Sequence, residues 1–357
     1  MSRNRISMSG ELFGRLAAYA IQGGVPIVNQ DAARWIKKKD DADSALMTAA
    51  SAVPRIVTRQ IRLVRIEHDE ELYFCTFGLP DPEQLPPELE LVDATPGIFA
   101  VAILKANVHP LVTIKPIEVK QVLDGQFMDN GSDYQGHDLE EVMRFFPNIV
   151  TYRATNIMQY HNCMDRVIGS ILARTYLDGP IELESETIDA LTVLFETSCD
   201  LIPFRNLVQG ILSISWENLF LECYRCIEQL YGMERFLALK AELNFASSPR
   251  ELAKLIEYKL SWRPKENEAF VALVRLCDQS LVRRICKDLG IRGRDYDKLS
   301  GKLSEKVYGL RNNIVHYRPS HNVVQKTESE WNAIIRAMID LISELYSRHA
   351  DQYFECV

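Results

Sequence analysis

The pattern of apolar and polar positions changes near residue 150 of the chain. Residues 55 to 123 contain apolar, β-branched runs, including LYFCTFGL, GIFAVAILKA and HPLVTIKPIEVKQVL, which are divided by turn-rich pieces such as GLPDPEQLPPE. Such runs are typical of strands. They predict a small, mainly antiparallel sheet, and one or two short helices are expected before it in residues 10 to 39.

From about residue 151 onward, apolar residues recur at the three- and four-residue spacing of helices. The predicted helices cover 153–176, 184–198, 204–232, 234–243, 249–260, 265–289, 302–317 and 328–348. Ser248, Pro249 and Glu251 have the spacing of a capping box, with proline at the first helical position.

The pattern therefore predicts an α+β protein with three parts. These are a small α/β domain in residues 1–150, a helical connection in 151–200 and an all-α bundle in 201–357. The length of 357 residues also fits roughly two domains.

Composition narrows the class of protein. The hydrophobic fraction of 47% is that of an ordinary globular chain, and the net charge of -8 requires any nucleic-acid site to be local. Uninterrupted apolar runs of about 18 residues are absent, so we expect no membrane span. The eight cysteines are scattered through helical segments, which favours reduced thiols and a cytoplasmic location.

Residues 302–317 contain the clearest candidate chemistry. On a helical wheel, an apolar stripe forms the core face, and it consists of Leu303, Val307, Leu310, Ile314 and Tyr317. Gly309 and His316 fall on the other side, so His316 is predicted to point away from its own core. A glycine inside a helix is tolerated where another backbone comes close, which suggests a second helix on this outer face.

His316 is also predicted to lie in the last helical turn, because Pro319 disfavours helical geometry at Arg318. The negative end of a helix stabilises an imidazolium, and an imidazole can act as a general acid or base. Arg311 can bind a phosphate through its forked guanidinium, and Asn312 can orient the imidazole or hold the phosphate. This combination predicts acid and base chemistry on an anion, with no metal and no cofactor.

RNNIVH at residues 311–316 resembles the RxxxxH signature, often RNxxxH, of the HEPN superfamily (higher eukaryotes and prokaryotes nucleotide-binding). The long segment at 217–237 and the preceding LSEKVYGL resemble the helices of such domains, and the resemblance covers roughly residues 195–350. It implies an all-helical domain and a metal-independent ribonuclease, and bacterial defence or toxin action would suit it.

Arg311 and His316 diverge by about 140° on one helix, so a single copy makes a poor catalytic pair. Two copies meeting across the Gly309 face would form a better site, which predicts a homodimer. The expected reaction on RNA leaves a 2′,3′-cyclic phosphate and a 5′-hydroxyl, since the attacking group is the ribose 2′-hydroxyl.

Local charge supports a phosphate-bearing substrate. Between residues 281 and 320, ten lysines and arginines against four aspartates and glutamates leave +6. Of these, Lys302, Lys306 and Arg318 are the candidate substrate-binding residues because they share the segment of the motif.

Two alternatives stay open. Glu118 and Lys120, on an apparent strand downstream of Asp93, resemble the Glu-x-Lys pair of metal-dependent nucleases of the PD-(D/E)xK type. A HEPN-like domain can also be catalytically inactive and serve as a dimerising or nucleotide-binding scaffold. In either case the first 150 residues are interpreted as a sensor or specificity module.

Overall fold

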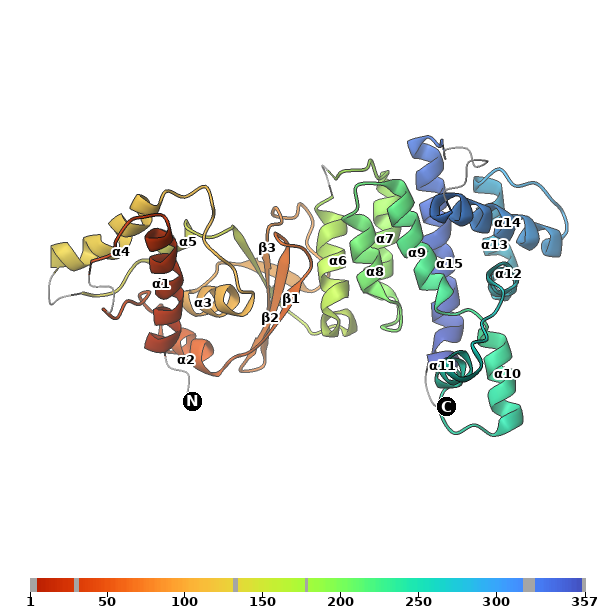
Figure 1. Cartoon of the computed structure of the whole chain (residues 1–357), viewed down its shortest axis with the longest axis horizontal. Coiled ribbons are helices and arrows are strands. Elements are labelled where there is room, and N and C mark those ends of the chain that lie inside the picture. The colour runs from red at the N-terminus through yellow and green to blue at the C-terminus, as the bar shows by residue number, and fades with distance from the viewer. Residues whose placement is uncertain (1–4, 29–31, 131–133, 177–178, 317–324, 355–357) are drawn as a thin grey trace. The chain divides into compact units, whose positions relative to one another are not determined.

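The computed structural model describes residues 5–28, 32–130, 134–176, 179–316 and 325–354. The chain divides into two compact units, Met1–Gln159 and Tyr160–Val357. The first unit holds a five-stranded antiparallel sheet with helices, and the helical part of the chain follows it (Figure 1). A mixed α and β chain with an antiparallel sheet near its N-terminus was predicted, and this is confirmed.

The sheet of unit 1 has the strand order β1-β2-β3-β5-β4. Its strands are β1 (Ser51–Ile56), β2 (Arg62–His68), β3 (Glu71–Phe77), β4 (Leu89–Val92) and β5 (Ile149–Ala154). All four pairings are antiparallel. The inner position of β5 between β3 and β4, although β5 follows three helices in the chain, was not predicted.

The β2–β3 hairpin turns in two residues. Asp69 and Glu70 both have positive φ, 46° and 68°, and His68 pairs with Glu71 across the turn. Positive φ at both central residues is the geometry of a type I′ turn, which matches the twist of paired strands. Glycine or asparagine usually occupies such positions, so this sequence gives no local signal of the turn.

The helices of unit 1 pack on one face of the sheet and contribute to its main core. They are α1 (Arg5–Gln22), α2 (Asp41–Ala49), α3 (Pro96–Lys105), α4 (Pro116–Asn130) and α5 (Leu139–Met143). The prediction of strands at GIFAVAILKA and HPLVTIKPIEVKQVL was therefore wrong, because these runs lie in or lead into α3 and α4.

The reason for the first error is that α3 is buried on all sides. Every residue from Pro96 to Ile103 is buried, so the run has no polar face that would reveal a helical period. The boundary signal is local: Thr95 caps the helix by accepting a hydrogen bond from the Ile98 N–H, and Pro96 is its first residue.

Unit 2 contains helices alone among its described residues. After a 3₁₀ turn at Gln159–Asn162, they are α6 (Met164–Arg174), α7 (Ser185–Thr197), α8 (Phe204–Ile211), α9 (Trp216–Glu228), α10 (Met233–Leu243), α11 (Pro249–Leu260), α12 (Glu266–Leu276), α13 (Gln279–Asp288), α14 (Tyr296–Val315) and α15 (Glu328–Phe354). The predicted start of α11 is confirmed, with Ser248 accepting from the Glu251 N–H.

Two predicted helices are interrupted. Ser215 caps α9 and so divides the predicted helix 204–232, and Asp278 caps α13 within 265–289. Both side chains accept a backbone N–H of the helix they start. The predicted helix 153–176 begins later, at Met164, because its first residues belong to β5.

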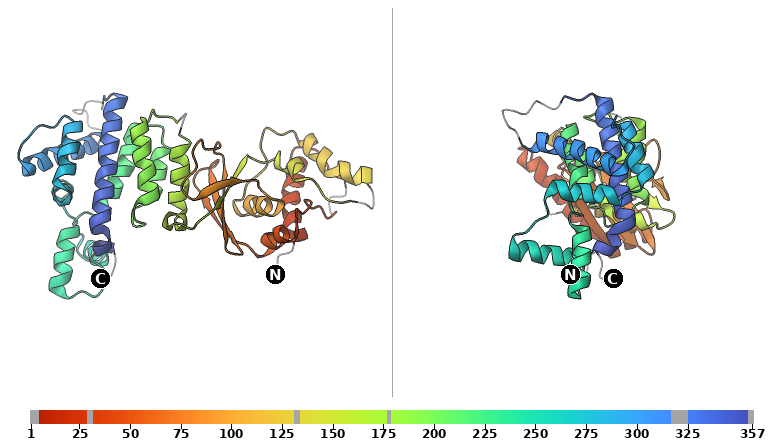
Figure 2. Two further views of the ribbon diagram at one scale, coloured as in Figure 1. Left: turned by 180° about the vertical axis from the view of Figure 1, so that it is seen from behind. Right: turned by 90° about the vertical axis from the view of Figure 1, so that its right-hand side faces the viewer.

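The long helix α15 organises unit 2. It packs against α7 and α9, and also contacts α11, α12 and α13 (Figures 1 and 2). Its predicted apolar stripe is buried, and comprises Trp331, Ile334, Ile335, Met338, Leu341, Ile342 and Leu345. The Tyr346 hydroxyl donates to the Cys226 carbonyl at 2.8 Å, which fixes α15 to α9.

The seven cysteines among the described residues are free thiols. In the same residues, no helix combines the length and the apolar character that a membrane crossing requires.

Candidate functional site

Helix α14 carries the candidate motif at its C-terminal end. Asp295 caps its start by accepting from the Lys298 N–H. Leu303, Val307 and Leu310 of the predicted stripe are buried, and Ile314 is half-buried. Tyr317, the last member of that stripe, lies outside the described residues.

His316 directly follows the last helical residue of α14. Its backbone N–H donates to the Asn312 carbonyl at 2.9 Å, and its side chain is exposed. The ring therefore sits at the negative end of the helix, outside the core formed by the apolar stripe. The imidazole is therefore accessible from solvent.

Arg311 lies on a different side of α14 and faces other helices of unit 2. Its Nη1 lies 3.2 Å from Glu266 Oε2 at the start of α12, and its Nη2 lies 3.7 Å from Glu228 Oε1 at the end of α9. The guanidinium also lies over the Tyr224 ring, 5.9 Å from its centroid. With a side chain only 16% exposed, Arg311 links three helices rather than projecting freely into solvent.

The surroundings of Arg311 are polar but largely removed from water. Burial raises the pKa of Glu228 above its ordinary value, and the nearby Arg311 only partly opposes this effect. The Tyr224 and Tyr231 hydroxyls lie 2.5 Å apart, and burial raises the pKa of both phenols. Sequence reasoning missed this cluster, because Glu228 and Glu266 lie on separate helices far from the motif in the chain.

The side chain of Asn312 accepts a hydrogen bond from its neighbour Arg311. Arg311 Nη1 donates to Asn312 Oδ1 at 3.1 Å, so the amide is half-buried beside the guanidinium. The structure thus brings Arg311 and Asn312 together, and His316 lies at the end of the same helix.

The two candidate substrate-binding lysines are exposed and flank the loop after α13. Lys302 Nζ donates to the Arg292 carbonyl at 2.9 Å, and Lys306 Nζ donates to the Leu289 carbonyl at 2.7 Å. Their positive charge stays at the surface. Arg318, the third candidate, lies outside the described residues.

The space beside the Cα of Gly309 is open. A Cβ built at Gly309 would meet no atom of another described element within 4 Å. The second helix that was expected on this face is therefore not supplied by the described part of the same chain.

The prediction of a strand that carries Glu118 and Lys120 was wrong, because both residues lie in α4. Val119 and Leu123 are fully buried and four residues apart, which is helical spacing. Residues two apart on a helix diverge by about 200°, so Glu118 and Lys120 share no face. Lys120 instead donates to Asp124 Oδ2 at 2.7 Å and to the Pro26 carbonyl at 2.6 Å.

Comparisons with known proteins give no relative to set beside this geometry. No protein-family model matches the chain, and neither the curated proteins nor the solved structures that were searched contain a match.

Proposed function

We propose that unit 2 contains a HEPN-type domain and that the protein is a metal-independent endoribonuclease. The observation that carries this proposal is the exposed imidazole of His316 at the C-terminal end of α14, with Arg311 and Asn312 within the same last turns of the helix. The all-helical surroundings of the motif agree with the resemblance.

In the proposed reaction, one His316 takes the proton of a ribose 2′-hydroxyl. The 2′-oxygen then attacks the adjacent phosphorus, and the bond from phosphorus to the 5′-oxygen breaks. A second His316, from the partner protomer, donates a proton to the departing 5′-oxygen. The products are a 2′,3′-cyclic phosphate and a 5′-hydroxyl, and the substrate is restricted to RNA.

Arg311 would stabilise the charge of the phosphate in this scheme. Its Nη atoms face Glu228, Glu266 and Asn312, whereas its Nε–H has no partner among the described residues. A donor is thus left for a phosphate oxygen, while the carboxylates hold the guanidinium in place. Asn312 then serves mainly to orient Arg311.

A symmetric dimer through the Gly309 face would complete the site. Arg311 and His316 diverge by about 140° around α14, so one protomer does not present both to one phosphate. A Cβ built at Gly309 would meet no atom of another described element within 4 Å, which leaves room for the α14 of a second protomer. An isologous contact of this kind places two motifs in one cleft.

The surface around the motif favours an anionic substrate. Lys302 and Lys306 are exposed on α14, and Arg283 and Lys287 are exposed on α13. Phosphates bound by such side chains release counterions, which supplies affinity that does not depend on sequence.

One observation favours the second candidate, a catalytically inactive dimerising or nucleotide-binding scaffold. Arg311 is engaged by Glu228 and Glu266, as a purely structural arginine would be. The two candidates differ in whether RNA is cut.

The test is incubation of the full chain with a single-stranded RNA in EDTA, followed by mass spectrometry of the ends. The proposal predicts cyclic phosphate and 5′-hydroxyl ends, and no cut at a position where a 2′-deoxynucleotide replaces the cleaved nucleotide. RNA that stays intact while the protein forms a dimer would support the scaffold instead.

A further inference from the structure

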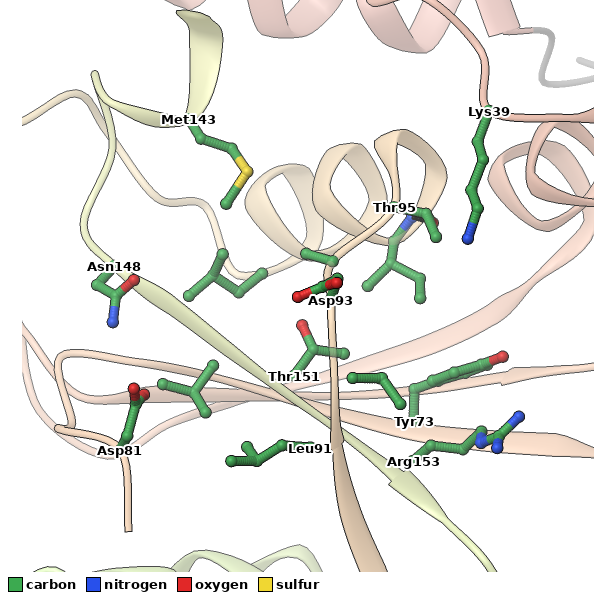
Figure 3. A pocket seen from close by; sticks show the side chains of 15 residues that line it. Lys39, Tyr73, Asp81, Leu91, Asp93, Thr95, Met143, Asn148, Thr151 and Arg153 are labelled. Carbon is green, nitrogen blue, oxygen red and sulfur yellow. Dashed lines mark hydrogen bonds between the residues drawn. The ribbon is translucent and has the colours of Figure 1, made fainter. Parts of the chain in front are cut away.

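Unit 1 contains a cavity of about 690 Å³ over the β4 and β5 side of its sheet (Figure 3). Helix α3 packs against β1 and β2, so it leaves this part of the same face open beside its first turn. The volume lies within the range of small-molecule sites.

On one wall of the cavity, the polar side chains already bond to one another. Arg153 Nε donates to Glu90 Oε1 at 2.6 Å, and its Nη1 lies 3.7 Å from Glu71, which accepts from the Tyr73 hydroxyl at 2.5 Å. Tyr73 and Glu90 are the register partners of Arg153 on β3 and β4, and Glu71 also lies on β3. Their charges are paired with one another, so they offer no unpaired charge to a ligand.

The backbone N–H groups at the start of α3 also have hydrogen-bond partners. The Gly97 N–H donates to Asp43 Oδ1 at 2.9 Å, and the Ile98 N–H donates to Thr95 Oγ1 at 3.2 Å. Because these amides have partners, the helix start is not available to a phosphate.

The polar groups that remain are Lys39, Asp81, Asp93 and Asn148. They line the cavity, are exposed, and have no hydrogen-bond or ion-pair partner among the described residues. In the view of Figure 3, Asp93 lies between Lys39 on one side and Asp81 and Asn148 on the other. The cavity thus presents the ammonium of Lys39, then the carboxylate of Asp93, and then the carboxylate of Asp81 beside the amide of Asn148.

The floor between these groups can hold an aliphatic chain. Ile98, Ile149 and Val150 line it, and Leu91 is 46% exposed there. Thr151 is only 2% exposed, and its hydroxyl pairs with the Cys75 thiol at 3.8 Å, so it is not offered to a ligand. A ligand with a short apolar chain would cover the exposed Leu91.

We propose that this cavity binds a free basic amino acid. Its carboxylate would pair with Lys39, its α-ammonium with Asp93, and its distal cation with Asp81 and Asn148. This order along the ligand complements the order of charges in the cavity, and hydrogen bonds between ionised groups are stronger than those between neutral groups. The inference is independent of the proposed ribonuclease activity.

The experiment is isothermal titration calorimetry of the full chain with L-lysine and L-arginine. Cadaverine and agmatine, the corresponding amines that lack the carboxylate, are titrated in the same way. We expect one saturable site, at least fivefold tighter for an amino acid than for its amine. Asp93→Asn should weaken all four ligands at least tenfold. Lys39→Met should weaken the amino acids to the level of the amines and leave the amines unchanged.

The controls are Glu83→Gln and Lys115→Met, which change exposed charges outside the cavity and should leave every affinity unchanged. Circular dichroism checks that each variant is folded. The proposal is overturned if none of the ligands gives saturable heat at millimolar concentration, if the amines bind as tightly as the amino acids, or if folded Asp93→Asn and Lys39→Met bind like the wild type.

Discussion

Arg311 and Glu266 form an ion pair, 3.2 Å from Nη1 to Oε2, that joins the motif-bearing end of α14 to the first residue of α12. Glu228 approaches the same guanidinium from the end of α9. One arginine of the proposed catalytic motif is therefore also a structural link between three helices.

Arg311→Ala is expected to lower the free energy of unfolding by about 1 to 2 kcal/mol, because it leaves the half-buried Glu228 and Glu266 without their cation. Urea unfolding measures this change. His316→Ala serves as the comparison, since the exposed ring of His316 should contribute little to stability. Equal effects of the two substitutions would refute the structural role of Arg311.

His137 is predicted to make unit 1 sensitive to acid. The ring is fully buried, lies against Phe13 at 4.9 Å, and neither ring nitrogen has a hydrogen-bond partner among the described residues. Burial lowers the pKa of His137 to about 4 from an ordinary value of 6.5. Unfolding therefore binds a proton between these pH values, so stability is present above pH 6.5 and falls as the pH drops toward 4.

The expected loss in that window is on the order of 1 kcal/mol per pH unit. Urea unfolding at a series of pH values measures it, and His137→Phe should flatten the dependence between pH 6.5 and 4. The same slope in a folded His137→Phe variant would show that other groups cause the acid sensitivity.

The β2–β3 turn gives a stabilising substitution. Glu70 has a φ of 68°, a conformation that costs a residue with a Cβ roughly 1 to 2 kcal/mol and a glycine almost nothing. Glu70→Gly should raise the free energy of unfolding by up to about 1 kcal/mol, after the greater chain entropy of glycine is subtracted. A lower melting temperature for this variant would contradict the turn geometry.

Lys302 and Lys306 are predicted to set the salt dependence of RNA binding. Replacing either by alanine should weaken binding similarly for all RNA sequences and reduce the slope of log affinity against log salt by about one per lost phosphate contact. Fluorescence anisotropy at several salt concentrations measures the slope. Lys115→Ala, an exposed lysine of unit 1, is the matched control, and equal slopes for it and Lys302→Ala would argue against RNA on this face.

The sequence predicted features that depend on neighbours in the chain. The capped start of α11 at Ser248 and the buried stripe of α15 follow from local spacing, and so does the exposure of His316. The α3 run misled because burial on all sides removes the polar face that distinguishes helix from strand. The glutamates at Arg311 could not be predicted, since tertiary packing alone brings α9, α12 and α14 together.

The most direct test of the central claim is the rate of RNA cleavage in EDTA by the wild type, by His316→Ala and by His109→Ala, an exposed histidine of unit 1 that serves as control. The account predicts that His316→Ala loses at least a hundredfold in rate, the range expected for a general acid or base, while His109→Ala cleaves like the wild type. Cleavage at the wild-type rate by a folded His316→Ala protein would contradict it.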